Sequence, residues 1–283
     1  MDIETLDQKI NLHFSGKVVR KDLTKAIKGN SVVPTYVLEY LLGQYCATDD
    51  EESIQSGIER VKKILAEHFV HRKESKLVQS NIREKGNHRV IDKVTVELNP
   101  SRDVYEATFM NLGLKKIKIG SDFARKHPKL LVGGIWCIVD LKYEATDEKG
   151  LQPWILEMLK PIQVSNFDDK QYLLARAEFE TEEWLDFLMQ SIGLNPEMLS
   201  HRAKLLQLIR LIPFCERNYN LIELGPKGTG KSHVFSEFSP HGILVSGGEI
   251  TVAKLFVNNA NAKVGLVGFW DSVAFDEFAG KIG

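Results

Sequence analysis

The spacing of hydrophobic residues changes along the chain, and the first 80 residues show the period of an α-helix. The clearest helical segment, residues 54–69, has apolar side chains at Ile54, Ile58, Val61, Ile64, Leu65 and Phe69. Thr48 and Glu51 have the spacing of a capping box just before it, so we expect Thr48 to cap this helix. A shorter apolar run at residues 36–42, after Pro34, predicts another helix that is more deeply buried.

Between residues 87 and 165, apolar and polar residues alternate, which is typical of strands with one buried face. The alternating or apolar runs are residues 94–98, 105–109, 116–119, 130–141 and 154–164. Gly133 and Gly134 interrupt the fourth run and predict a bulge or a sharp bend there. About five short strands in this length predict a small barrel or sandwich, and an OB-like barrel fits the pattern.

Helical spacing returns over residues 168–213. Thr181 is placed to cap one helix, and Asn195 with Pro196 suits the N-cap and first position of another, which Pro213 ends. The patterns together predict a mixed α/β chain of four parts. These are a helical N-terminal region (1–85), a β-rich, OB-like barrel domain (86–166), a helical connector (167–215) and the start of an α/β nucleotide-binding domain (216–283).

The strongest chemical signal is residues 225–232, Gly-Pro-Lys-Gly-Thr-Gly-Lys-Ser, which match the phosphate-binding loop G-x-x-x-x-G-K-[ST]. The apolar run 220–224 predicts a buried strand before the loop, and Ser232 onward predicts a helix after it. We expect Lys231 to reach the β- and γ-phosphates of ATP and Ser232 to bind Mg²⁺. The full set of expected nucleotide-binding residues is Gly225, Pro226, Lys227, Gly228, Thr229, Gly230, Lys231 and Ser232.

A second apolar run, residues 273–275, ends in Asp276 and Glu277. A P-loop ATPase needs one carboxylate at a strand end to hold Mg²⁺ and a residue that orients the attacking water. We assign the first role to Asp276 and the second to Glu277. Glu277 and Lys231 are therefore the expected catalytic residues. A solvated strand end is the alternative interpretation of the two acids.

Composition limits the classes of function. The 283 residues carry a formal net charge of −1, so binding to nucleic acid must depend on local patches. The three cysteines form no C-x-x-C pair, which argues against a zinc site or a disulfide framework and favours a reducing, cytoplasmic location. The sequence has no signal-peptide pattern and no apolar run of membrane-spanning length, so we expect no membrane association.

Two clusters of basic residues are candidates for DNA contact. The first lies in the β-rich domain and consists of Lys115, Lys116, Lys118, Arg125, Lys126 and Lys129. The second lies near the N-terminus and consists of Lys17, Arg20, Lys21, Lys25 and Lys28. A solvated, solubilising face is the alternative for both clusters. His68 and His71 lie three residues apart, but they lack the further ligands of a metal site.

Several segments resemble the Lon-like AAA+ ATPases of bacterial BREX phage-defence systems, the BrxL family. The segments that carry the resemblance are residues 37–51, 218–232, 242–248, 264–271 and 275–277. The resemblance implies an N-terminal region associated with DNA, an AAA+ ATPase core and a C-terminal domain similar to Lon protease. It also implies self-association into rings and other BREX components as partners. By position it assigns triphosphate and Mg²⁺ binding to Lys231 and Ser232, Mg²⁺ to Asp276 and water positioning to Glu277.

Members of this family are longer than this chain, which has six residues after Glu277. We therefore expect this chain to be the N-terminal portion of such a protein and to contain no protease site. In an AAA+ sheet of order 5-1-4-3-2, the run 220–224 would lack strand 4 as its neighbour, so we expect weak or no ATP hydrolysis by this chain alone. The leading hypothesis is an ATPase that handles DNA in phage defence. The alternatives are a DNA-binding and assembly module with an inactive ATPase half, and a protein-unfolding subunit of an ATP-dependent protease.

Overall fold

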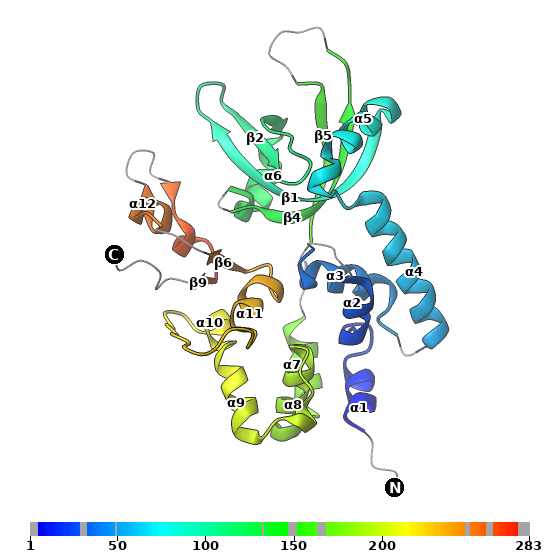
Figure 1. Ribbon diagram of the computed structural model, residues 1–283, viewed down its shortest axis with the longest axis vertical. Helices are drawn as coiled ribbons and strands as arrows, with labels where there is room; N and C mark the ends of the chain where they lie inside the picture. Colours follow the sequence, from blue (N-terminus) through cyan, green and yellow to red (C-terminus); the bar gives the residue numbers. More distant parts are fainter. Residues whose placement is uncertain are drawn as a thin grey trace. The chain divides into compact units, whose positions relative to one another are not determined.

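The computed structural model describes residues 5–28, 33–48, 50–131, 133–146, 152–162, 168–246, 250–258 and 263–276. The chain forms two compact units, each built from segments that are distant in the sequence (Figure 1). The first unit comprises Met1–Lys62, Val164–Gly248 and Asp271–Gly283, and the second comprises Lys63–Gln163 and Glu249–Trp270. The four-part division predicted from the sequence stays a prediction.

The N-terminal region is helical, as expected. Its helices are α1 (Leu6–His13), α2 (Lys21–Lys28), α3 (Thr35–Tyr45) and α4 (Glu51–His68), the last of which continues into the second unit. Thr48 is not the cap of α4, because the carboxylate of Asp50 accepts the backbone N–H of Ser53 at 2.8 Å. Asp50 lies one residue before the first turn and is therefore better placed to reach that N–H group than Thr48.

The connector is also helical. Its elements are α7 (Asp169–Ala177), α8 (Thr181–Ser191), η3 (Pro196–Met198), α9 (His201–Ile209) and α10 (Ile212–Cys215). Asn195 caps only the short η3, and α9 begins separately because the Ser200 hydroxyl accepts the N–H of Ala203. Thr181 is the first residue of α8 rather than its cap, which is Glu180.

An aromatic core joins the N-terminal and connector helices within the first unit. The ring of Phe14 is buried, and its centroid lies 5.3–6.0 Å from those of four other rings. Those rings belong to Tyr172, Phe179, Trp184 and Phe187. Aromatic contacts at these distances stabilise the helix packing beyond simple area burial.

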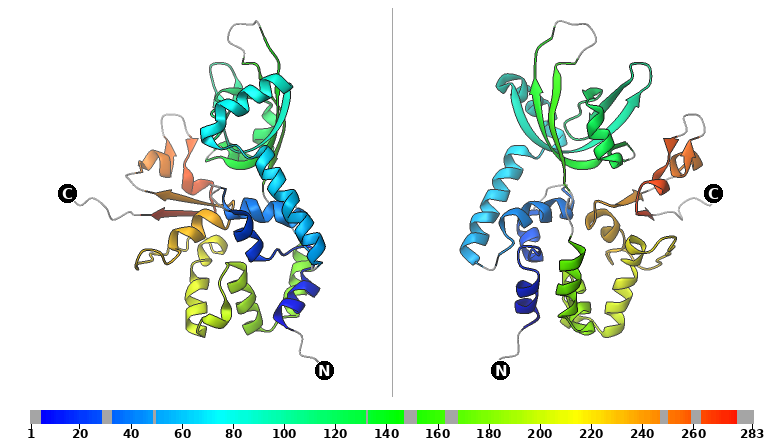
Figure 2. Two further views of the ribbon diagram at one scale, coloured as in Figure 1. Left: turned by 45° about the vertical axis from the view of Figure 1, so that its right-hand side comes forward. Right: turned by 180° about the vertical axis from the view of Figure 1, so that it is seen from behind.

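The second unit is built around five antiparallel strands, which confirms the number predicted. They are β1 (Asn87–Asn99), β2 (Val104–Phe109), β3 (Ile117–Ile119), β4 (Ile135–Tyr143) and β5 (Trp154–Pro161), in the order β3-β2-β1-β4-β5. The sheet curls into an open half-barrel (Figures 1 and 2). Helix α5 (Ser75–Lys85), preceded by η1 (Arg72–Glu74), comes before the sheet, and α6 (Ser121–Lys126) with η2 (Pro128–Leu131) connects β3 to β4.

Buried residues follow the predicted alternation in this sheet. Ile117 and Ile119 are buried while Lys118 between them is exposed. The predicted bend before β4 is at Gly134, whose φ of +72° is in the left-handed region. Asp92 is fully buried, and its carboxylate accepts the backbone N–H groups of Lys93, Asn111 and Leu112. It thereby fixes the turn that follows β2.

The C-terminal segment, residues 216–283, contributes elements to both units. In the first unit these are α11 (Lys231–Glu237) and a parallel pair, β6 (Gly242–Ser246) and β9 (Ser272–Asp276). In the second unit they are α12 (Val252–Leu255), β7 (Val257–Asn258), β8 (Lys263–Val264) and η4 (Leu266–Gly268).

The strand predicted at residues 220–224 is not formed. The side chains of Ile222 and Leu224 are 86% and 90% exposed, and no backbone hydrogen bond joins this run to another described segment. A strand exists only where its backbone groups pair with a neighbour, and none of the described strands lies beside it.

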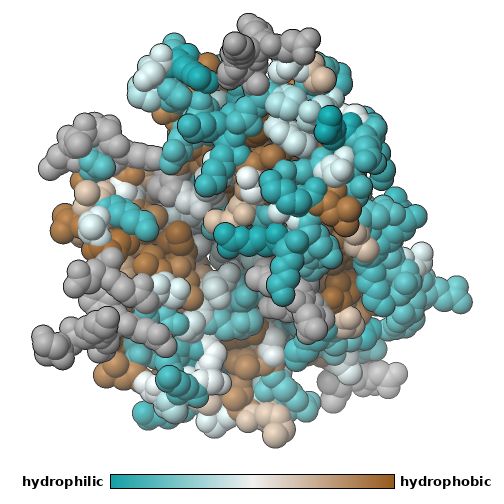
Figure 3. Space-filling view, turned by 45° about the horizontal axis from the view of Figure 1, so that its top comes forward, coloured by the Kyte–Doolittle hydropathy of each residue, from teal (hydrophilic) through white to brown (hydrophobic). Residues whose placement is uncertain are grey.

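The face of the molecule in Figure 3 is mostly hydrophilic, with several separate hydrophobic areas. Exposed apolar side chains of the C-terminal segment include Val252, Phe256, Val257, Val264 and Val267. No helix in the described ranges has the length and hydrophobicity needed to cross a bilayer.

Candidate nucleotide-binding site

The loop 225–230 leads directly into helix α11, which begins at Lys231. Gly228 and Gly230 have φ angles of +81° and +76°, in the left-handed region where a side chain would introduce strain. The loop residues are exposed to solvent. A glycine-rich turn before a helix can direct several backbone N–H groups toward an anion.

The ammonium group of Lys231 lies within the loop. Its Nζ donates to the carbonyl oxygens of Gly225 at 3.0 Å and Pro226 at 2.6 Å, and to Oγ1 of Thr229 at 3.1 Å. All three acceptors are loop oxygens that a phosphate could replace as partners of the ammonium. Lys227, by contrast, is exposed.

Ser232 and Asp276 lie in contact although they come from different elements. Ser232 is on the first turn of α11, and its Oγ donates to Oδ2 of Asp276 at 2.6 Å. Asp276 is the last residue of β9, opposite Ser246 of β6. A hydroxyl and a carboxylate oxygen are the hard ligands that Mg²⁺ takes, so this pair fits the predicted metal role. Glu277 lies outside the described residues.

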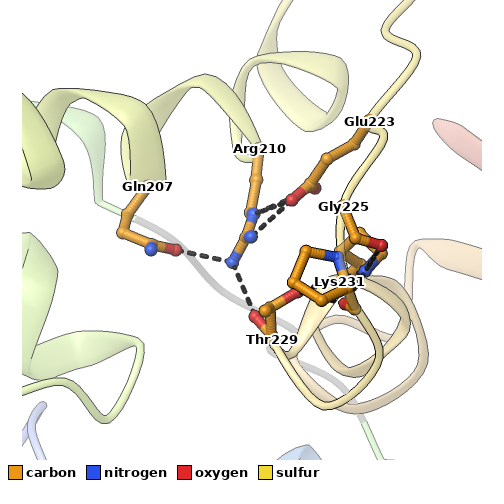
Figure 4. A network of polar contacts seen from close by, with 7 residues as sticks. Gln207, Arg210, Glu223, Gly225, Thr229 and Lys231 are labelled. Atoms are coloured by element: carbon orange, nitrogen blue, oxygen red, sulfur yellow. Dashed lines mark hydrogen bonds and ion pairs between the residues drawn. The ribbon is translucent and has the colours of Figure 1, made fainter.

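Arg210 contacts the loop from the end of helix α9, a position that carried no signal in the sequence (Figure 4). Its Nε donates to Oε2 of Glu223 at 3.0 Å, and its Nη2 also pairs with Glu223. Its Nη1 donates to Oε1 of Gln207 at 2.6 Å and to the carbonyl oxygen of Thr229 at 3.3 Å. The guanidinium therefore joins the segment before the loop to the loop itself.

The C-terminal end of α11 is anchored to the N-terminal helices of the same unit. The carboxylate of Glu237 accepts both the backbone N–H and the hydroxyl of Thr35, at 2.8 and 2.9 Å. Pro34, the N-cap residue of α3, supplies no capping side chain, so Glu237 takes that role. Helix α11 is thus fixed at the end opposite to the loop.

The predicted basic cluster of the β-rich domain separates into groups with different surroundings. Lys115, Lys116 and Lys118 are exposed on β3 and the turn before it, and Lys126 is exposed at the end of α6. None of these four forms an ion pair with a residue that the structure describes. Arg125 is paired with Asp122, and Nζ of Lys129 lies 5.8 Å from the ring centroid of Trp270.

Two of the five residues of the N-terminal basic cluster are neutralised by acidic neighbours. Arg20 pairs with Asp22 at 2.7 Å and with Glu51 at 2.5 Å, and Lys21 pairs with Glu39. The first pairing raises the pKa of Arg20 and holds that of Asp22 below its usual range. Lys17 and Lys25 remain exposed, while the side chain of Lys28 lies outside the described parts. The cluster in the β-rich domain is therefore the better candidate for binding phosphate groups.

Trp270 connects the C-terminal segment to the half-barrel inside the second unit. Its ring is 8% exposed and lies so close to Gly133 that a Cβ there would meet the ring at 2.8 Å. Sequence periodicity predicted a bend at Gly133 but not this packing partner. In the described part of the chain, no group of three His, Cys, Asp or Glu side chains is arranged to hold a metal.

Comparison with known proteins covers nearly the whole chain. Residues 12–143 match the family "BREX system Lon protease-like protein BrxL N-terminal", and residues 154–282 match "Lon-like protease BrxL-like, ATPase domain". The chain is 53% identical over 279 residues to the Lon-like protease BrxL of Bacillus cereus (strain H3081.97) and 50% identical over 275 residues to that of Escherichia coli O9:H4 (strain HS). These alignments cover 98% and 97% of this chain but 41% and 40% of the relatives, so the chain spans about two fifths of their length.

Proposed function

The chain belongs to the BrxL family of Lon-like proteins from BREX systems, and we propose on this basis that residues 225–232 bind ATP. The observation that carries the proposal is the contact between Ser232 and Asp276 beside the loop. In P-loop ATPases the serine of the phosphate-binding loop and a carboxylate at a strand end hold Mg²⁺, and the contact supports the same two roles for Ser232 and Asp276.

In the proposed complex, the backbone N–H groups of the loop surround the phosphates. Lys231 exchanges its loop acceptors for oxygens of the β- and γ-phosphates, and its charge offsets theirs. Ser232 and Asp276 would hold Mg²⁺, and the ion would supply positive charge that offsets the negative charge of the phosphates. Glu277 would orient the attacking water.

We propose DNA as the substrate on which this ATPase acts. The strand order β3-β2-β1-β4-β5, with α6 between β3 and β4, is consistent with an OB-like barrel. Such barrels bind nucleic acid on the face of their second and third strands. Lys116 and Lys118 are on β3 or at its start and are available to pair with phosphate groups. Ring assembly and contact with other BREX components, which the family resemblance implies, belong to the same proposal.

The test is ATP turnover and DNA binding by the full-length protein. We expect Glu277→Gln to retain ATP binding but to lose hydrolysis, because an amide cannot polarise water as a carboxylate does. Normal ATP turnover in this variant would favour the alternative interpretation, in which Asp276 and Glu277 are only solvated acids at the end of a strand. DNA binding without any ATP turnover in the wild type would support an assembly module instead. ATP-dependent unfolding of a protein substrate without DNA binding would support a protease subunit.

A further inference from the structure

We propose that Arg210 is a positioning residue for phosphate binding, which acts by fixing the orientation of the peptide bond between Thr229 and Gly230. The inference rests on the proposed ATP binding by residues 225–232. It assigns a role to a side chain that lies outside the phosphate-binding motif.

All three nitrogen atoms of the guanidinium group donate to neighbouring side chains. Glu223 accepts from Nε at 3.0 Å and also from Nη2, while Gln207 accepts from Nη1 at 2.6 Å. A planar guanidinium with several fixed partners has a defined direction for each remaining N–H group. The side chain of Arg210 is 13% exposed, so solvent competes little for these contacts.

The contact to Thr229 determines which way the loop backbone faces. Nη1 of Arg210 donates to the carbonyl oxygen of Thr229 at 3.3 Å. The described peptide bonds are all trans, and in a trans peptide the C=O and the following N–H point in opposite directions. The N–H of Gly230 is therefore directed away from Arg210. Because Gly230 has a φ of +76° and no side chain, this peptide could otherwise rotate with little resistance.

Charge pairing argues that Arg210 is not itself a phosphate ligand. The carboxylate of Glu223 neutralises the guanidinium through two of its nitrogen atoms. Lys231 is the cation whose partners are all oxygens of the loop. Arg210 thus acts through the backbone of Thr229, whereas Lys231 would act on the phosphates directly.

The experiment compares Arg210→Gln with Lys204→Gln. Lys204 is a matched control because it lies on the same helix, pairs with Asp186 and has a side chain that is also 13% exposed. ATP binding is measured by titration with a fluorescent ATP analogue in Mg²⁺, and AMP binding by competition. For Arg210→Gln we expect the Kd for ATP to rise about tenfold. A change of this size corresponds to the free energy of one hydrogen bond to a charged group. The Kd for AMP should change less, because the loop mainly holds the phosphates beyond the first. Lys204→Gln should bind ATP as the wild type does.

Arg210→Lys is the second variant, in case Arg210→Gln does not fold. A lysine keeps the charge but cannot hold Glu223, Gln207 and Thr229 together, so the same direction of change is expected. Wild-type ATP affinity in either folded Arg210 variant would overturn the proposal, as would an equal loss in Lys204→Gln. An equal loss of ATP and AMP affinity would also overturn it, because that result indicates general damage to the site. Lys231→Ala is measured alongside: if it binds ATP normally, or if the wild type does not bind, the proposed function fails together with this inference.

Discussion

The hydroxyl of Ser232 donates a hydrogen bond of 2.6 Å to the carboxylate of Asp276, although the two residues are 44 positions apart in the sequence. The contact joins the first turn of α11 to the end of β9. Strand β9 is held in place by its parallel pairing with β6, in which Ser246 is opposite Asp276. The two oxygens are therefore positioned by backbone structure on both sides.

We predict that Ser232→Ala reduces the Mg²⁺-dependent part of ATP binding. The substitution removes one of the two oxygens proposed to hold the metal, so the Kd for ATP in Mg²⁺ should approach the Kd in EDTA. Ser236→Ala is the matched control, because Ser236 is on the same helix and, among the described residues, its hydroxyl bonds only to the carbonyl oxygen of His233, at 3.5 Å. A Mg²⁺ effect of wild-type size in Ser232→Ala would contradict the assignment.

A second prediction concerns DNA. Lys116→Glu with Lys118→Glu should weaken binding to all DNA sequences alike, since phosphate contacts carry no sequence information. Binding should also depend less steeply on salt, by a log–log slope of about 0.9 for each phosphate of duplex DNA that the protein no longer neutralises. Folding should be retained, because both side chains are exposed while Ile117 and Ile119 remain in the core.

The control for this pair is Lys73→Glu with Lys85→Glu. Both lysines are exposed, and the change in net charge is the same. An equal reduction of DNA affinity in the two double variants would show a general charge effect. Unchanged affinity in the folded Lys116 and Lys118 variant would remove β3 from the DNA-binding surface.

Gly133→Ala should loosen the packing of Trp270 on the half-barrel. The added Cβ would lie 2.8 Å from the indole ring, which must then shift. Overpacking of this kind costs about 1–3 kcal/mol. Hydrogen–deuterium exchange should become faster across residues 263–270. Gly120→Ala is the control, since the nearest neighbour of its Cβ would be Phe123 at 3.9 Å. Equal exchange rates in both variants would mean that Trp270 is not held at Gly133.

The buried Asp92 predicts a pH dependence of stability. Burial raises its pKa from 3.8 to about 6, partly offset by the backbone N–H groups of Leu112, Asn111 and Lys93. Between pH 4 and pH 6 the folded protein therefore holds a proton that the unfolded chain has released. Stability from this residue falls as pH rises through that window, by up to about 3 kcal/mol.

The measurement for Asp92 is the free energy of unfolding in urea at pH 4, 5, 6 and 7. Asp92→Asn lacks the titrating group, although its amide leaves one backbone donor facing an NH₂ group. The stability advantage of the wild type over this variant should shrink from pH 4 to pH 6 and then stay constant. A constant or growing advantage over that range would show that Asp92 is ionised throughout.

Local patterns in the sequence were sufficient to predict several of the regular elements. Alternation around Ile117 and the glycine pair at Gly133 and Gly134 predicted a strand and a bend that the structure contains. The motif at residues 225–232 predicted a loop followed by a helix, and α11 begins at Lys231. These features depend on residues close together in the sequence, where period and turn chemistry are informative.

Features that depend on distant neighbours could not be predicted in this way. The apolar run that includes Ile222 and Leu224 has the composition of a strand, but composition does not show whether a pairing partner is present. The spacing of Thr48 and Glu51 predicts that Thr48 caps α4, and only the geometry shows that Asp50 accepts the N–H of Ser53 instead. Arg210 belongs to no motif, and its role follows only from its three contacts.

The most direct test of the central claim is Mg²⁺-dependent ATP binding by Lys231→Ala beside Lys227→Ala. Both variants remove one lysine from the same loop, but only Lys231 has its ammonium group among the loop oxygens. We predict that isothermal titration detects ATP binding by the wild type and by Lys227→Ala, and none by Lys231→Ala at the same concentrations. Equal ATP affinity in all three proteins would contradict the assignment of residues 225–232 as the nucleotide site.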